Sequence, residues 1–253
     1  MIEVHQHILT DILVPMREQA CENSLPFFTS LFLGSISPDV TLCFAQFDAD
    51  RFDTTAEGFN QIIAQAGLSH AVRKRQIEFY AGRCLARCAI GIHKLPRGAT
   101  GAPVWPVGRT GAISHIAQSV ALIEGVRNRR LGVDVQEILH GTELQAVSSL
   151  ALTANERTWL EGEPLLRQTQ LITIAFSAKE AVFKALAAEI DGRPDFCVAE
   201  MLPLTGRLNT LRLQLVTPLA DHLPIGTILK AYFGWFEDEV ITWIDETRPT
   251  CLL

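Results

Sequence analysis

The feature that most constrains the fold is a long helical pattern over residues 165–190, followed by four short strand patterns. Apolar side chains recur at helical spacing along this segment at Leu171, Ala175, Ala178, Val182, Ala185 and Leu186. The strands are expected at about 196–202, 209–217, 227–236 and 238–244, separated by Pro203, Pro224 and Gly226. One long helix beside consecutive short strands is typical of a helix packed on an antiparallel sheet.

The first half of the chain repeats this arrangement. Residues 26–47 are strand-rich, a helix is predicted from Ser69 with that serine as its cap, and residues 112–125 form a strand, a turn and a second strand. Residues 94–111 are rich in glycine and proline and are expected to form a long loop. We therefore predict an α+β fold with two comparable lobes, residues 1–131 and 132–253, that meet near Gly132.

Composition excludes several classes of protein. The chain of 253 residues is 48% hydrophobic, which favours a well-buried globular protein. Its formal charge of −6 disfavours a general nucleic-acid binder. It has no apolar run of the ~18 residues that a membrane span needs. The early Glu3 and the absence of a basic start lead us to expect a cytoplasmic protein. Its six cysteines lack metal-site spacing and are expected to be reduced, packed thiols.

The stretch LGVDVQEI places a charged side chain, Asp134, in an otherwise apolar strand. A buried carboxylate is costly unless it is paired, hydrogen-bonded or bound to a cation. Two interpretations remain open at this point: a salt bridge with an arginine, or a ligand for Mg²⁺, which prefers carboxylates, waters and phosphate oxygens. In the second case Glu180 could supply another carboxylate.

The segment SAKEAVFK carries Glu180 and Lys184, which share a helix face because they are four residues apart. Ser177 and Glu180 also fit a capping box, and Glu180 with Lys184 fits an exposed salt bridge. The apolar pattern continues through Ser177, however, and places this serine in the helix interior. The segment therefore has structural as well as functional interpretations.

A loop rich in glycine, RGATGAP, begins at Arg97 and could bring backbone amides and one fixed charge to an anion. It is not a Walker A loop, and a plain surface turn is the alternative. Ser114 and His115 follow shortly afterwards. Taken together, two carboxylates, a lysine, this loop and a histidine indicate a site for a phosphate-bearing substrate and Mg²⁺.

The order of these segments resembles that of the phosphopantetheinyl transferases. IEFYAGRCLARCAI, RGATGAPVWPVGRTGAISH, GVDVQ, TANERTWL and FSAKEAVFKAL follow one another over about Arg73 to Leu186. The combination of GVDV with FSAKEAVFK is specific, whereas either motif alone is modest. The likeness is greatest to the two-lobed bacterial members of siderophore and natural-product pathways, the enterobactin pathway among them.

The resemblance implies two lobes related by a pseudo-twofold axis, with coenzyme A (CoA) and Mg²⁺, or Mn²⁺ in its place, in the cleft between them. It implies transfer of 4′-phosphopantetheine from CoA to a serine of an apo acyl, aryl or peptidyl carrier domain. No nucleic acid and no membrane span take part, and two internal lobes make a monomer the expected state.

The resemblance also implies a role for each matching residue. Asp134 and Glu180 would bind the metal, and Gln136 stands where many relatives carry a Glu ligand. Glu180 would act as the base and Lys184 would contact the CoA phosphates. The remaining CoA contacts would be Arg83, Arg97, Ser114, His115 and Lys179.

The neutral Gln136 predicts retained activity with weaker metal affinity or altered metal choice. It also motivates an alternative, a catalytically impaired module that binds CoA or docks a carrier. A pyrophosphate hydrolase is a second alternative, although the Glu-rich helix motif of such enzymes is absent. Arg127, Arg129 and Arg130 are candidates for carrier docking by charge alone, with a solvated loop as the structural alternative.

Overall fold

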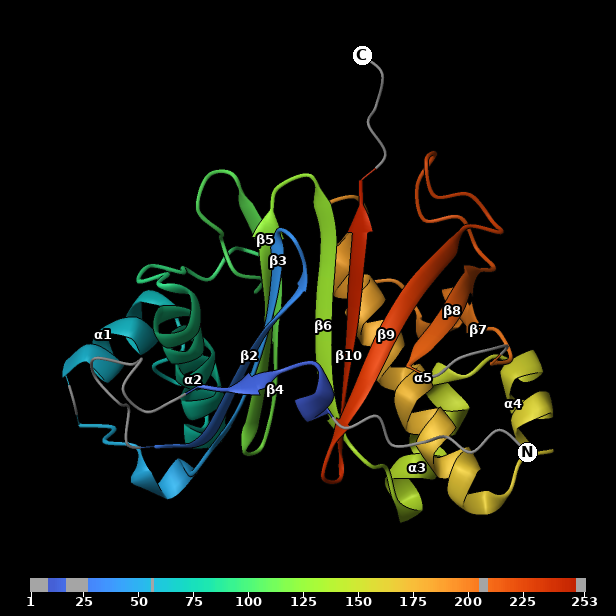
Figure 1. Cartoon of the computed structure of the whole chain (residues 1–253), viewed down its shortest axis with the longest axis horizontal. Helices are drawn as coiled ribbons and strands as arrows, with labels where there is room; N and C mark the ends of the chain where they lie inside the picture. The colour runs from blue at the N-terminus through green and yellow to red at the C-terminus, as the bar shows by residue number, and fades with distance from the viewer. Residues whose placement is uncertain (1–8, 17–26, 56, 205–208, 249–253) are drawn as a thin grey trace. The chain divides into compact units, whose positions relative to one another are not determined.

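The computed structural model describes residues 9–16, 27–55, 57–204 and 209–248 (Figure 1). The helices are α1 (Glu57–Gln65), α2 (Arg73–Ile90), α3 (Gly141–Ala151), α4 (Ala154–Leu160) and α5 (Leu165–Leu186), with short 3₁₀ turns at Leu9–Asp11, Ala49–Arg51 and Phe196–Val198. The strands are β1 (Val14–Pro15), β2 (Phe28–Ser37), β3 (Val40–Phe47), β4 (Arg109–Ile116), β5 (Ser119–Val126), β6 (Arg129–Glu137), β7 (Ala199–Met201), β8 (Thr210–Leu215), β9 (Ile228–Phe236) and β10 (Glu239–Thr247).

The strands form two antiparallel sheets, and the predicted α+β class is confirmed. One sheet has the order β1-β2-β3-β5-β4 and the other the order β6-β10-β9-β8-β7. The chain divides into two compact units between Asn128 and Arg129, at the turn before β6 and three residues before the predicted seam at Gly132. We call residues Thr10–Asn128 the first unit and Arg129–Leu253, with which Leu9 is grouped, the second unit. The pseudo-twofold relation stays a prediction.

In the first unit, helix α2 packs on β3, β4 and β5, and α1 packs beside α2 (Figure 1). The buried face of α2 includes Ile77, Ala81 and Leu85, which follow the helical period. The prediction that Ser69 caps this helix is wrong. The helix begins at Arg73, and the residue before it, Val72, makes no side-chain capping bond. The C-terminal end does have a local stop signal, because Gly91 adopts the left-handed conformation there.

In the second unit, the long helix α5 lies against β6, β9 and β10 (Figure 1). The four strands predicted in the tail are all present within a few residues of their expected bounds. The predicted capping box is also confirmed. The Thr153 side chain accepts from the backbone N–H of Glu156, whose carboxylate accepts in return from the Thr153 N–H.

Gly132 sets how closely strand β6 can approach helix α5. A Cβ atom added there would lie 1.9 Å from the carbonyl oxygen of Ala181 and 2.8 Å from the backbone nitrogen of Ala185. Both neighbours are helix backbone and cannot rotate away. The glycine therefore lets the strand backbone lie directly on the helix, and Asp134, on the same strand face two residues later, is brought to α5.

We expect Gly132→Ala to lower the free energy of unfolding by about 1–3 kcal/mol, because the added methyl forces β6 away from α5. Urea unfolding monitored by tryptophan fluorescence measures the loss. Gly58→Ala in α1 is the matched control, since an added Cβ there meets no atom within 4 Å. An equal loss in both variants would contradict the close-approach argument.

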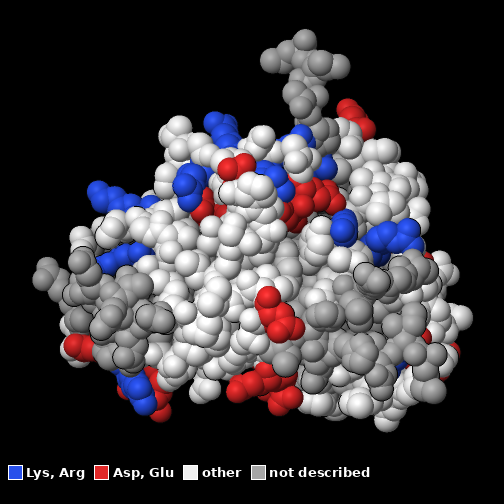
Figure 2. Space-filling model, in the orientation of Figure 1, with Lys and Arg blue, Asp and Glu red and all other residues white. Residues whose placement is uncertain are grey.

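Figure 2 shows Lys and Arg beside Asp and Glu along the upper part of the face in view, with wide uncharged areas below them. The net negative charge therefore does not make this face uniformly acidic. Among the described residues, no helix is both long and apolar enough to cross a membrane. Cys43, Cys84, Cys88 and Cys197 are free thiols, and the first two are buried. Cys21 and Cys251 lie outside the described residues.

Candidate functional site

Asp134 lies on β6 with 5% of its surface exposed, and its two carboxylate oxygens have different partners. Lys184 Nζ donates to Oδ1 at 2.7 Å, and Ser177 Oγ donates to Oδ2 at 2.8 Å. Both partners come from α5 and are seven residues apart, two turns along one face of the helix. The helix face and the strand thus form a small polar site inside the second unit.

Two structural interpretations of SAKEAVFK are wrong. Ser177 is an interior, fully buried residue of α5, so it does not open a capping box with Glu180. Lys184 pairs with Asp134 rather than with Glu180, and Glu180 forms its ion pair with Arg193. Asp134 forms an ion pair with Lys184, whereas the structural interpretation expected an arginine.

The ionised carboxylate of Glu180 is a stronger base than that of an ordinary glutamate. Burial raises the pKa of its carboxyl above the ordinary value, and the nearby Asp134 charge raises it further, while Lys184 and Arg193 act in the opposite direction. A base needs its ionised form, so a base with a raised pKa loses activity as the pH falls through that raised value. The negative charges of Asp134 and Glu180 repel one another, so a cation bound near both would stabilise the pair.

Gln136 shares the strand face of Asp134, as the alternation of β6 requires. Its Nε2 donates to the backbone carbonyl of Glu137 at 3.1 Å. That bond uses the amide nitrogen, and the amide oxygen is the part of the side chain that can act as a metal ligand.

The donor set fits a hard divalent cation. Asp134 and Glu180 could supply carboxylate oxygens and Gln136 an amide oxygen, all donors that Mg²⁺ accepts, and substrate phosphate would complete such a shell. Among the described residues, no group of three or more His, Cys, Asp or Glu side chains could hold a metal by itself. A site with two carboxylates is consistent with that finding, because Mg²⁺ is commonly held by one or two carboxylates plus phosphates.

Lys179 is not available as a phosphate contact, so the prediction that it contacts CoA is wrong. Its side chain is fully buried, with Nζ donating to Glu156 Oε2 at 2.7 Å and to the Ala151 carbonyl at 2.6 Å. Burial lowers the pKa of its ammonium, and the Glu156 charge opposes that effect. Glu156 Oε1 accepts from the Met201 N–H at 2.7 Å, so Lys179 belongs to a buried network that ties α4 to α5 and β7.

In the first unit, Arg83 lies near two further guanidinium groups. Its pKa is lowered to about 10 by burial and by the positive charges of Arg75 and Arg97. Its Nε donates to the Leu95 carbonyl at 3.1 Å, and its guanidinium carbon lies 3.7 Å from the centre of the Phe79 ring. Within the described part of the chain, its buried Nη2 has no hydrogen-bond partner. A cluster of cations with an unsatisfied donor is suited to an anion.

His115 belongs to the same neighbourhood. Its Nδ1 lies 3.3 Å from Glu78 Oε2, and its Nε2 lies 2.6 Å from Arg75 Nη1. Because arginine only donates, Nε2 accepts from it and Nδ1 carries the proton that faces Glu78. Ser114 is buried on the opposite face of β4, so the structure does not bring these two predicted side chains together.

Sequence reasoning did not include Arg75 among the site residues. Arg75, Phe79 and Arg83 are spaced by four residues along α2, which places them on one helix face. That spacing was the available signal. Arg97 lies in a turn closed by the Gly98 N–H to the Ala102 carbonyl at 2.8 Å, so the expected turn is present and carries the arginine.

Two of the arginines considered for carrier docking are engaged in ion pairs. Arg130 is buried and donates to Glu189 at 2.6 Å, and Arg129 Nε donates to Asp245 at 2.6 Å. Only Arg127 of the three is exposed. The predicted docking role of Arg129 and Arg130 is therefore not supported, and neither residue is part of a solvated loop.

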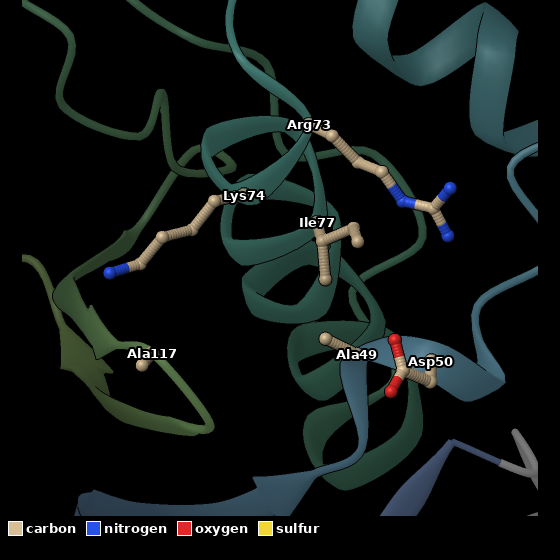
Figure 3. A pocket seen from close by; sticks show the side chains of 6 residues that line it. All are labelled: Ala49, Asp50, Arg73, Lys74, Ile77 and Ala117. Carbon is tan, nitrogen blue, oxygen red and sulfur yellow. The ribbon is translucent and has the colours of Figure 1, made fainter.

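A separate hollow of about 210 Å³ lies at the start of α2. Figure 3 shows Arg73 and Lys74 extending to opposite sides of it, with Ile77 between them and Asp50 opposite Arg73. Ala49 and Ala117 complete its lining. None of the predicted site residues lines this hollow.

Comparison with known families assigns both units. A model of the 4′-phosphopantetheinyl transferase N-terminal domain matches residues 64–123, and a model of the 4′-phosphopantetheinyl transferase superfamily matches residues 130–236. Enterobactin synthase component D of Salmonella typhimurium is 33% identical over 198 residues, which cover 74% of this chain and 82% of that protein. The chain belongs to the 4′-phosphopantetheinyl transferase superfamily.

Two further relatives and one solved structure also match parts of the chain. Enterobactin synthase component D of Escherichia coli O157:H7 is 35% identical, covering 60% of this chain and 73% of that protein. The 4′-phosphopantetheinyl transferase Svp of Streptomyces mobaraensis is 33% identical over 54% of this chain and 58% of that protein. A solved structure of a holo-(acyl-carrier-protein) synthase from Bacillus anthracis covers 47% of this chain and 96% of its own, with 18% identity and a TM-score of 0.34.

Proposed function

We propose that this transferase moves 4′-phosphopantetheine from CoA to a serine of an apo acyl, aryl or peptidyl carrier domain, with Mg²⁺ at Asp134, Glu180 and Gln136. The observation that carries the proposal is the arrangement of Asp134, Glu180 and Lys184 on β6 and α5. It joins two repelling carboxylates to one lysine in a chain whose relatives include named 4′-phosphopantetheinyl transferases. In the first unit, Arg75, Arg83 and Arg97 form a separate group of positive charges that is suited to an anion.

In the reaction, the carrier serine oxygen forms a bond to a phosphorus of the CoA pyrophosphate. The bond from that phosphorus to the bridging oxygen breaks, and 3′,5′-ADP leaves. Glu180 takes the serine proton, a role that its raised pKa supports. Lys184, whose side chain is 27% exposed, donates to a pyrophosphate oxygen and stabilises the charge that develops on it.

Mg²⁺, when bound, would neutralise the pyrophosphate and help to orient it for in-line attack. Asp134 and Glu180 would hold the ion through carboxylate oxygens, and Gln136 through its amide oxygen or an intervening water. Mn²⁺ has the same preference for oxygen ligands and should replace it.

The first unit would bind the nucleotide phosphates of CoA. Arg83 supports this with its buried, unsatisfied Nη2, and Arg97 and Arg75 add charge beside it. To donate to the adenosine 3′-phosphate, His115 Nε2 would have to carry a proton and give up the bond that it now accepts from Arg75. Arg75 would then be free to donate to the same phosphate.

One assay tests the proposed reaction. The transferase is incubated with CoA, Mg²⁺ and an apo carrier domain, and the carrier is then weighed by mass spectrometry. A gain equal to 4′-phosphopantetheine supports transfer. Cleaved CoA with an unmodified carrier would instead show a hydrolase, and bound but intact CoA would show a binding module. Either of these two outcomes overturns the proposal.

We expect His115→Ala to raise the KM for CoA by about tenfold, since a hydrogen bond to a charged group contributes roughly 1.5–3 kcal/mol. The KM for 3′-dephospho-CoA should change little, because that substrate lacks the phosphate that His115 would contact. His93→Ala, which removes an exposed histidine of the same unit, is the control. An equal rise for both substrates would argue that His115 acts elsewhere.

We expect Gln136→Glu to lower the Mg²⁺ concentration for half-maximal activity by about tenfold, because a third carboxylate strengthens a site for a hard cation. A Mg²⁺ titration of the transfer rate measures the change. Gln145→Glu adds the same charge at an exposed position of α3 and should leave the titration unchanged. If half-saturation by Mg²⁺ does not fall in Gln136→Glu, the idea of a neutral metal ligand is wrong.

The pathway is proposed from the relatives alone. Siderophore synthesis, or another secondary-metabolite pathway, is supported by the likeness to enterobactin synthase component D. A cytoplasmic location and a monomeric state stay predictions, and gel filtration with light scattering tests the second.

A further inference from the structure

Asp134 is held by a chain of hydroxyl groups that the reaction itself does not use. Ser177 Oγ lies 2.8 Å from Asp134 Oδ2 and 2.9 Å from Thr242 Oγ1. Thr242 lies on β10 directly opposite Asp134 in the antiparallel register. Ser177 and Thr242 are both fully buried. Three residues from two strands and one helix therefore meet through two short hydrogen bonds.

The direction of these bonds follows from the chemistry of the groups. An ionised carboxylate only accepts, so Ser177 must use its single proton toward Asp134. The contact between the two hydroxyls then has Thr242 as donor and Ser177 as acceptor. A serine inside a helix commonly donates back to a backbone carbonyl four residues earlier. Here the proton of Ser177 is instead committed to Asp134.

The result is an asymmetric carboxylate. Oδ2 is engaged on the buried side, whereas Oδ1 faces Lys184, whose side chain is 27% exposed. A carboxylate held at one oxygen cannot rotate freely about its terminal bond, and its other oxygen is kept at a fixed position. Lys184 alone would not do this, because a flexible ammonium can follow a rotating carboxylate.

We propose that Ser177 and Thr242 are positioning residues that orient Asp134 so that Oδ1 is presented to Lys184 and to the divalent cation. This inference rests on the proposed function, because it concerns the same site. It assigns a role to Ser177, the serine of FSAKE. It also assigns one to Thr242, which lies more than 100 positions after Asp134 and belongs to no motif identified in the sequence. Both side chains are fully buried, so we assign neither a contact with the substrate.

The threonine offers a pair of variants that separates orientation from packing. Thr242→Val keeps the shape of the side chain and removes the hydroxyl, whereas Thr242→Ser keeps the hydroxyl and removes a methyl. Ser177→Ala removes the bond to Asp134 directly. Losses of supporting contacts to metal ligands typically weaken metal affinity by about 10- to 100-fold.

The experiment measures Mn²⁺ binding by electron paramagnetic resonance in the presence of CoA, beside the Mg²⁺ titration of the transfer rate. We expect the Mn²⁺ Kd to rise by about tenfold or more in Ser177→Ala and by a smaller factor in Thr242→Val. It should stay close to the wild-type value in Thr242→Ser. The KM for CoA should change little in all three, because the nucleotide contacts are elsewhere.

The outcomes separate this inference from the proposed function. If the wild-type protein transfers phosphopantetheine while Thr242→Val and Ser177→Ala bind Mn²⁺ as it does, the positioning role is wrong and the function stands. If Thr242→Ser loses as much affinity as Thr242→Val, packing rather than the hydroxyl is responsible and the inference is also wrong. If Ser177→Ala does not fold, the Thr242 pair still decides between these outcomes.

Discussion

Replacing Glu180 by Gln should lower the transfer rate at saturating CoA by about 10²–10⁴-fold, the range in which a positioned base contributes. The amide keeps the size of the side chain but cannot accept the serine proton, and it supplies no charge to the cation. The KM for CoA should change far less than kcat, because Glu180 is not among the proposed nucleotide contacts. Both kcat and the KM for CoA can be measured by quenching the reaction at set times and determining the modified carrier by mass spectrometry.

Two controls make the Glu180 result specific. Asp191→Asn removes an exposed carboxylate just after α5 and should keep the full rate. Arg193→Ala removes the ion partner of Glu180 but leaves the base. Since Arg193 lowers the pKa of Glu180, its loss should move the acidic limb of the pH–rate profile to higher pH. A full rate in Glu180→Gln would remove this residue from the mechanism.

Replacing Glu156 by Gln should lower the free energy of unfolding by about 3–5 kcal/mol, the cost of leaving one partner of a buried ion pair without its counter-charge. The side chains of Glu156 and Lys179 are both completely buried. The change leaves the Lys179 ammonium beside a neutral amide in the interior. Urea denaturation with linear extrapolation measures this loss.

The paired variant Lys179→Met distinguishes a structural from a substrate-binding role. The structure predicts a stability loss with an unchanged KM for CoA, because the Lys179 ammonium faces Glu156 and the Ala151 carbonyl. Combining Lys179→Met with Glu156→Gln should cost less than the sum of the two single changes. A stable Lys179→Met protein with a raised KM for CoA would show instead that Lys179 reaches the substrate.

Much of the fold could be predicted because its signals are local. The capping box at Thr153 and Glu156, the apolar stripe of α5 and the strands of the tail all depend on neighbours in sequence. The start of α2 was missed because Val72 makes no side-chain cap, so its N-terminal boundary carries no residue signal. The role of Gly132 depends on the backbone of α5, and no local pattern reports such a distant contact.

The sequence predicts those parts of the candidate site that depend on which residues share a face of α5. Ser177, Glu180 and Lys184 share one face of α5, whereas Lys179 lies with the apolar stripe, so helix phase would have argued against a role for Lys179 at the substrate. Thr242 could not be found, because only strand register places it opposite Asp134. Arg75 could have been found from its spacing to Arg83, but its contact with His115 required the fold.

The most direct test of this account is the mass of an apo carrier domain after incubation with CoA and Mg²⁺, measured side by side for the wild-type protein and for Asp134→Asn. Circular dichroism first establishes that both proteins are folded. The account predicts a gain of 4′-phosphopantetheine on the carrier serine with the wild-type protein and an unmodified carrier with Asp134→Asn. Modification at equal rates by the two proteins, or none by the wild-type protein, would contradict it.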